Sequence, residues 1–155
     1  MPSKHPPVRP ARRTDGPALR PLQSLLSEPS PPLLSAALAE LSTDTVEPTG
    51  SPRAWRLLVS PNSDDRPVGY LLATTGESTH IAELAVDPAY RRESRATTLL
   101  EAICDDATAP VTVHVAASNE PAQSLYWRVG FVQSSRSTEQ FDSSDGLTLQ
   151  YDPEN

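Results

Sequence analysis

Residues 119–131 read NEPAQSLYWRVGF, and this stretch decides the fold of a chain of 155 residues. Proline is favoured in the first turn of a helix, so Pro121 marks a helix start. One face of that helix then carries Ala122, Leu125, Tyr126 and Val129. Gly130 follows at the position where glycine commonly ends a helix. The stretch therefore predicts a helix that packs on a core and ends just before Phe131.

Residues 81–96 read IAELAVDPAYRRESRA and form a second informative stretch. An apolar strand pattern ends at Asp87-Pro88, and an amphipathic helix follows. The apolar face of that helix carries Ala96, Leu99, Leu100, Ile103, Cys104 and Ala107. The first N–H groups of a helix lack intrahelical partners, and the helix dipole attracts anions there. The arginine-rich turn before this helix therefore indicates a phosphate cradle, with a solvated turn as the alternative.

Together the two stretches resemble the GNAT superfamily of N-acetyltransferases, and more closely its branch of ribosomal-protein alanine acetyltransferases. One signature of that superfamily is matched at all six defined positions by Asn119, Ala122, Leu125, Tyr126, Gly130 and Phe131. The other signature is matched by Leu84, Val86, Pro88, Tyr90, Arg91 and Ala96. Two residues depart from it: Ser94 stands where glycine is usual, and Arg95 where an apolar residue is more frequent.

The rest of the chain supports one domain over residues 8–155, after a proline-rich arm at 1–7 that we expect to be disordered. Strand patterns cover residues 8–11, 55–60, 68–74, 79–86, 111–116, 131–141 and 147–151. Helix patterns cover residues 15–26, where Asp15 is the expected N-cap, 30–41, the stretch after Pro88 and 121–129, with a loop at 42–54. The resemblance implies the α/β (α+β) GNAT acyl-CoA N-acyltransferase fold. In that fold a mixed central sheet of about seven strands packs with about four helices, and two parallel strands splay apart at the cofactor cleft.

The resemblance also implies acetyl-CoA as co-substrate, with its pantetheine arm in the gap between the splayed strands. By similarity, the backbone of Leu84, Ala85 and Val86 would bond the pantetheine amides. The phosphates would be held by the turn and first helical residues, namely Arg91, Arg92, Glu93, Ser94, Arg95, Ala96 and Thr97. Asn119 would contact the cofactor, cap the following helix, or do both.

The reaction that the resemblance implies is direct attack of a primary amine on the acetyl thioester. Tyr126 is the candidate acid for the leaving thiolate, and core packing is its alternative role. Glu83 ranks first as the base, His114 second and His80 third, although each fits a half-buried sheet residue equally well. Cys104 lies in an apolar helix stripe and is interpreted as a core residue rather than a nucleophile.

A second function remains open, a non-catalytic acyl-CoA-binding regulatory module, because Ser94 and Arg95 alter the phosphate turn. No acceptor signature is recognisable, so a protein N-terminus, a lysine and a small-molecule amine all remain candidates. We expect a monomer or a homodimer.

The net charge of −7 is unevenly distributed. Residues 1–20 carry five basic side chains and one acidic, which leaves a net charge of −11 on residues 21–155. The acidic body should repel nucleic acid. The basic start of the chain is either a short solvated tail or a segment that contacts an anionic partner. No apolar run approaches the roughly 18 residues of a membrane helix, and a lone cysteine excludes an internal disulfide and a zinc cluster. We therefore expect a cytoplasmic protein, and 12 arginines against one lysine suggest a high-salt cytoplasm.

Overall fold

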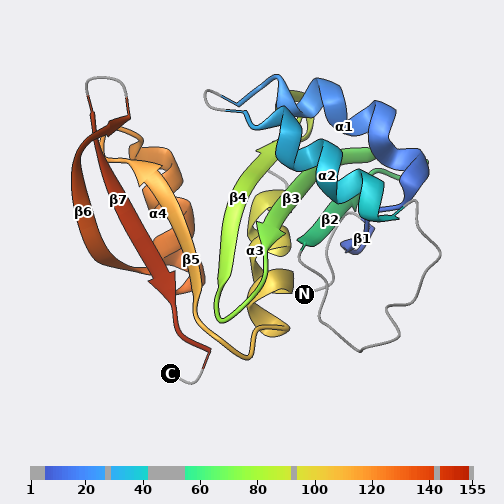
Figure 1. Ribbon diagram of the computed structural model, residues 1–155. Coiled ribbons are helices and arrows are strands. Elements are labelled where there is room, and N and C mark those ends of the chain that lie inside the picture. Colours follow the sequence, from blue (N-terminus) through green and yellow to red (C-terminus); the bar gives the residue numbers. More distant parts are fainter. Residues whose placement is uncertain (1–5, 27–28, 42–54, 92–93, 142–143, 154–155) are drawn as a thin grey trace.

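The computed structural model describes residues 6–26, 29–41, 55–91, 94–141 and 144–153. In this part of the chain a single seven-stranded sheet has the order β1-β2-β3-β4-β5-β7-β6 and carries four α-helices (Figure 1). The mixed sheet of about seven strands with about four helices is confirmed. Within the described residues, no helix has the length and hydropathy needed to cross a membrane.

The strands are β1 (Arg9–Pro10), β2 (Trp55–Pro61), β3 (Pro67–Thr74), β4 (Thr79–Val86), β5 (Val111–Ala116), β6 (Val132–Phe141) and β7 (Ser144–Tyr151). The helices are α1 (Gly16–Gln23), α2 (Pro31–Leu41), α3 (Arg95–Asp105) and α4 (Glu120–Val129), with 3-10 turns η1 (Arg13–Asp15) and η2 (Pro88–Tyr90). Strands β4 and β5 have the bounds that the sequence predicts. The predicted loop at 42–54 and residues 1–5 of the predicted arm lie outside the described residues.

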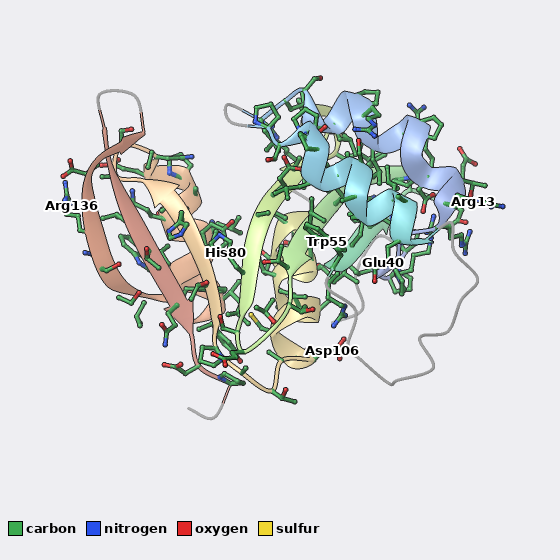
Figure 2. The ribbon with its side chains drawn as sticks, viewed as in Figure 1. Arg13, Glu40, Trp55, His80, Asp106 and Arg136 are labelled. Atoms are coloured by element: carbon green, nitrogen blue, oxygen red, sulfur yellow. The ribbon has the colours of Figure 1, made fainter. Side chains whose placement is uncertain are left out.

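Each face of the sheet has its own hydrophobic core. Helices α1 and α2 pack over β2, β3 and β4, where the fully buried side chains include Leu19, Leu34, Val59, Tyr70 and Leu72. Helices α3 and α4 cover the other face, with Leu99, Leu100, Ile103, Val111 and Phe131 at its centre. Figure 2 shows His80 near the middle of the molecule, while Arg13 and Arg136 lie at opposite ends.

The parallel strands β4 and β5 pair over only three positions. The last paired residues are Ile81 and Val113, and both strands continue beyond them without pairing to each other. At the same point β4 contains a bulge: Leu72 of β3 lies opposite Glu83 and Ala73 lies opposite Ile81, so Ala82 is an extra residue. A bulge bends a strand and increases its twist. The implied splay between two parallel strands is therefore observed, and it begins at the bulge.

Helix α4 ends as the sequence predicts. Gly130 adopts a φ of 121°, and a Cβ built there would lie 3.3 Å from the Tyr151 ring. This region of φ favours glycine, and a Cβ at this position would also press on the Tyr151 ring. The glycine therefore turns the chain from α4 into β6.

Asp15 occupies the predicted N-cap position of α1, but its carboxylate makes no capping bond to the helix, because groups that precede it hold the carboxylate. Asp15 accepts from the backbone N–H of Arg12 at 2.7 Å and from Arg9 Nη1 at 2.9 Å. Arg9 and Arg12 also bond to Asp65, at 3.0 and 2.6 Å, in the turn between β2 and β3. Arg9 and Arg12 therefore form ion pairs within the chain, which link its start to the turn between β2 and β3.

We predict that Asp15→Asn lowers the free energy of unfolding by about 1–3 kcal/mol, because it leaves charge-assisted bonds to Arg9 unmade at a site only 6% exposed. Urea denaturation measures the change. Asp64→Asn, at an exposed neighbour of Asp65, is the control and should stay within about 0.5 kcal/mol of the parent protein. Equal losses in both variants would contradict the assigned role of Asp15.

Candidate active site

The gap between β4 and β5 is part of a continuous groove made of three adjoining hollows. The hollow at the start of α3 has a volume of about 340 Å³, and the middle and far hollows each have about 470 Å³. The first two share Val86, Arg91, Ala96 and Leu125 as lining residues. The last two share Leu26, Leu84, Asn119, Ala122 and Tyr126. The groove therefore runs from the start of α3, between the splayed strands, to the segment that joins α1 and α2.

The middle of the groove follows an open strand edge. Pairing with β5 stops at Ile81, so the backbone of residues 82–86 has no strand partner on that side among the described residues. Leu84, Ala85 and Val86 line the middle hollow. Unpaired strand N–H and C=O groups bond readily to an extended polar ligand. This edge suits a ligand with amide groups along its length.

The turn at the first hollow has a strained backbone. Ser94 adopts a φ of 62° and a ψ of 22°, the left-handed region that glycine occupies without cost. Its carbonyl accepts from the Thr98 N–H at 2.9 Å, which starts α3. Arg91 lines this hollow, and its Nε donates to the Val86 carbonyl at 3.2 Å. The turn thus keeps the shape that a glycine would give it and places the start of α3 at the groove. Arg92 and Glu93 lie outside the described residues.

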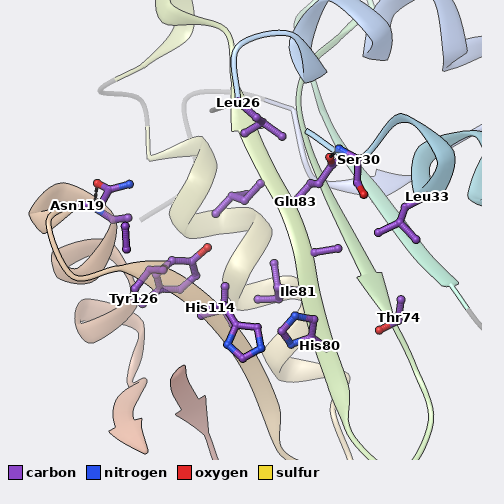
Figure 3. Close-up of a pocket in the computed structure, with 16 residues that line it drawn as sticks. Leu26, Ser30, Leu33, Thr74, His80, Ile81, Glu83, His114, Asn119 and Tyr126 are labelled. Atoms are coloured by element: carbon purple, nitrogen blue, oxygen red, sulfur yellow. Dashed lines mark hydrogen bonds between the residues drawn. The ribbon is translucent and has the colours of Figure 1, made fainter. Parts of the chain in front are cut away.

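Tyr126 stands where the middle and far hollows meet (Figure 3). Its side chain is 5% exposed, and its ring packs edge-on against Phe131 at 5.3 Å between centroids. Burial raises the pKa of Tyr126 above its usual value, so the phenol stays protonated. No described residue bonds to its hydroxyl, which leaves a buried O–H donor facing the cavity.

Glu83 is 3% exposed and its carboxylate accepts four hydrogen bonds. Gln23 Nε2 donates to its two oxygens at 3.0 and 3.2 Å. The Tyr70 hydroxyl donates at 3.0 Å and the Ser30 N–H at 2.6 Å. Burial and then the nearby charge of Glu83 raise the pKa of Tyr70. The bulge at Ala82 turns Glu83 to the α1 face, opposite Ile81, so the carboxylate fastens α1 and the residue before α2 to the sheet.

Two histidines lie side by side in the far hollow. The rings of His80 on β4 and His114 on β5 are 4.7 Å apart between centroids (Figure 3). His80 Nδ1 lies 3.0 Å from Thr112 Oγ1, and His114 Nδ1 lies 2.9 Å from Thr148 Oγ1. Burial, and secondarily His114, lowers the pKa of His80. The far hollow therefore combines two imidazoles with the Tyr126 hydroxyl.

A family model described as Acetyltransferase (GNAT) family matches residues 22–131. The chain belongs to this acetyltransferase family. A comparison with curated protein sequences gives no match. Among solved structures, the ribosomal-protein-S18-alanine N-acetyltransferase from Escherichia coli is similar, with a TM-score of 0.75, 17% identity and coverage of 94% of this chain and 92% of the other. The spermidine/spermine N-acetyltransferase from Vibrio cholerae has a TM-score of 0.71, 18% identity and coverage of 94% and 91%. At these identities the two structures show the shared GNAT fold.

Every predicted site residue in the described part of this GNAT protein lines the groove. Ser94, Arg95, Ala96 and Thr97 line the hollow at α3, and Glu83, His114 and Asn119 line the far one. Asn119 Oδ1 also accepts from the Ala122 N–H at 3.2 Å, so its predicted role as the cap of α4 is confirmed. The roles in catalysis and cofactor binding remain predictions.

Arg95 does not turn its charge toward the groove. Its guanidinium is buried, donates to Ser60 Oγ at 3.0 Å and to the Pro61 carbonyl at 2.8 Å, and lies 5.2 Å from the centre of the Tyr90 ring. The side chain therefore contacts the end of β2, and Arg95 contributes its backbone to the first turn of α3.

Arg128 is a groove residue that sequence reasoning missed. It is exposed on α4 and lines the hollow at the start of α3. Its position three residues after Leu125, which lines the same hollow, was the available signal, since residues three apart share a helix face. With Arg91, it supplies positive charge at the hollow beside the start of α3.

We predict that Ser94→Gly raises the free energy of unfolding by up to about 1 kcal/mol, because glycine removes the cost of a left-handed serine. Thermal and urea unfolding measure this change. Ser24→Gly is the control: Ser24 has a φ of −66°, so glycine there should destabilise by about 0.5–1 kcal/mol. A loss of stability in both variants would contradict a strained turn at Ser94.

Proposed function

We propose that this chain is an acetyl-CoA-dependent N-acetyltransferase that transfers an acetyl group to a primary amine by direct attack on the thioester. One observation carries the proposal: the open edge of β4 leads from the start of α3 to a buried Tyr126 hydroxyl that has no partner among the described residues. A groove of this kind suits a long ligand with a phosphate end, an amide-bearing arm and a reactive end. Membership of the acetyltransferase family supports the same ligand.

The residues that would hold acetyl-CoA are spread along the groove. The backbone of Leu84, Ala85 and Val86 would bond the pantetheine amides along the open strand edge. The first N–H groups of α3, from Ser94 to Thr97, would bond the phosphates, with Arg91 beside them. Asn119 lines the same hollow. When bound, the cofactor supplies an acetyl group activated as a thioester.

Tyr126 is proposed as the acid. The raised pKa of its phenol keeps the proton available, and its hydroxyl has no competing partner among the described residues. As the amine nitrogen forms a C–N bond with the acetyl carbon, the C–S bond breaks and the Tyr126 O–H protonates the sulfur. Core packing against Phe131 holds the ring in place for this role.

For the base, the contacts support His114 ahead of Glu83, the reverse of the order that the sequence suggested. Both carboxylate oxygens of Glu83 already accept bonds that hold α1, β3 and Ser30. His114 is exposed in the far hollow. A neutral imidazole accepts a proton readily near pH 7. In this proposal Glu83 fixes the wall of the acceptor cavity and His114 takes the proton.

The far hollow is the proposed acceptor site, and the two similar structures suggest which amines to try first. One acts on an alanine of a ribosomal protein and the other on spermidine or spermine, by their names. The informative panel therefore contains peptides with an N-terminal alanine, peptides with an internal lysine, and spermidine. Release of free CoA in the presence of acetyl-CoA reports transfer to any of them.

We predict that Tyr126→Phe lowers kcat about 10²- to 10⁴-fold and leaves the Kd of acetyl-CoA within about twofold, because only proton donation is lost. Tyr151→Phe is the matched control, since Tyr151 also packs against Phe131, at 5.7 Å between centroids. A chain that binds acetyl-CoA but releases no CoA with any amine would instead support the non-catalytic acyl-CoA-binding module.

We also predict that kcat does not fall between about pH 8 and pH 10. An acid works only while protonated, and burial moves the pKa of Tyr126 upward, so its protonated range extends to higher pH. A pH profile with the best amine, checked by circular dichroism for intact structure, measures this. A decline that follows an ordinary phenol near pH 10 would contradict the assignment.

A further inference from the structure

We propose that His80 and His114 act as one proton-accepting pair, and that Thr112 and Thr148 hold both rings with the proton on Nδ1. In that tautomer Nε2 of each ring carries the lone pair that receives a proton in the far hollow. The catalytic meaning of the pair rests on the proposed function. The tautomers of the two rings and the sharing of a proton between them do not rest on that function, and both can be measured without any substrate.

The strand registers build this arrangement. In the parallel pair of β4 and β5, His80 lies opposite Thr112, and His114 is two residues further along β5 on the same face. In the antiparallel pair of β5 and β7, His114 lies opposite Thr148. Two histidine–threonine cross-strand pairs therefore stand side by side across three strands. Directly opposite residues are the closest side chains in a sheet, which fits Nδ1 to Oγ1 distances of 3.0 and 2.9 Å.

The chemistry of the hollow favours the Nδ1–H tautomer. A threonine hydroxyl can accept from Nδ1–H or donate to a bare Nδ1, so the distance alone allows both. The other polar groups that line the hollow include the Tyr126 hydroxyl, an O–H donor, and the Glu83 carboxylate, which already accepts four bonds. An incoming amine brings N–H donors and needs acceptors. Nε2 lone pairs on both rings supply them.

The two rings can hold one proton between them more easily than two. Their centroids are 4.7 Å apart, so a charge on one ring opposes a charge on the other. Thr112 of β5 and Thr148 of β7 bond to the two rings, and the other polar residues that line the hollow are Ser30, Thr74 of β3, Glu83 of β4, Asn119 and Tyr126 of α4. Glu83 is the one carboxyl group among these residues, and its own partners hold it.

In the transfer step the pair takes one proton from the amine nitrogen as the C–N bond forms. The C–S bond breaks and Tyr126 protonates the sulfur, as proposed above. The imidazolium then loses its proton to solvent from the exposed His114 ring, and solvent returns one to Tyr126. Protons and electrons balance without a further reactant.

Nuclear magnetic resonance tests the pair directly. The chain has three histidines, so long-range ¹H–¹⁵N correlations are simple to assign with His80→Gln and His114→Gln. Above the titration range, the expected result is Nδ1–H on both rings. Across it, we expect His114→Gln to move the titration curve of His80 to higher pH, because His114 lowers the pKa of His80. An Nε2–H tautomer on either ring, or a His80 curve unchanged by His114→Gln, overturns the proposal.

Thr148→Val is the kinetic test, with Thr148→Ser as its matched control. Valine keeps the shape and removes the hydroxyl, so His114 should change to the Nε2–H tautomer and kcat should fall about 10- to 100-fold. The KM of acetyl-CoA should not change, and serine should restore both tautomer and kcat. A valine variant with the parent kcat and tautomer overturns the proposal while leaving the transferase function intact. If no amine accepts acetyl in the parent protein, the proposed function fails, and the resonance measurement still decides the pair.

Discussion

Strand β4 stops pairing with β5 after Ile81 and Val113, and the rest of the site depends on that interruption. A parallel pair that continued to Val86 would consume the backbone groups of residues 82–86 in a ladder. It would also close the space between β4 and α4 that Tyr126 lines. The bulge at Ala82 marks the place where β4 leaves its neighbour. The sheet lacks a few backbone hydrogen bonds between β4 and β5, and the edge of β4 therefore stays open inside the molecule, beside the start of α3.

Because of the same bulge, neighbouring side chains of β4 lie on different faces of the sheet and have different roles. Ile81 faces the core under α3, whereas Glu83 faces α1 and fixes the wall of the far hollow through Gln23 and Ser30. His80, just before the bulge, lies beside His114 of β5.

The groove carries positive charge at the start of α3. Arg91 and Arg128 lie at the helix start, in a chain whose net charge is −7. The local arrangement therefore favours an anionic ligand end that the overall charge opposes.

Sequence patterns predicted the bounds of helices and strands well where a single local pattern determined them. Alternation and flanking turn residues placed β4 and β5, and proline and glycine placed α4. The signature around Asn119 and Tyr126 located the groove. Three features could not be predicted, because each depends on contacts distant in sequence. The bulge at Ala82 depends on the register between β3 and β4. The buried position of the Arg95 guanidinium depends on its bond to Ser60 of β2, and the Asp15 carboxylate is held by Arg9 and not by the helix that follows it. The threonine partners of the histidines likewise come from other strands.

The central claim is that the open edge of β4 receives the amide-bearing arm of acetyl-CoA. Amide hydrogen exchange, followed residue by residue with and without acetyl-CoA, tests it most directly. We predict that acetyl-CoA slows exchange within residues 84–86 and in the first turn of α3, and leaves Ile81, already within the ladder with β5, unchanged. Binding of acetyl-CoA without protection at residues 84–86 would contradict the account.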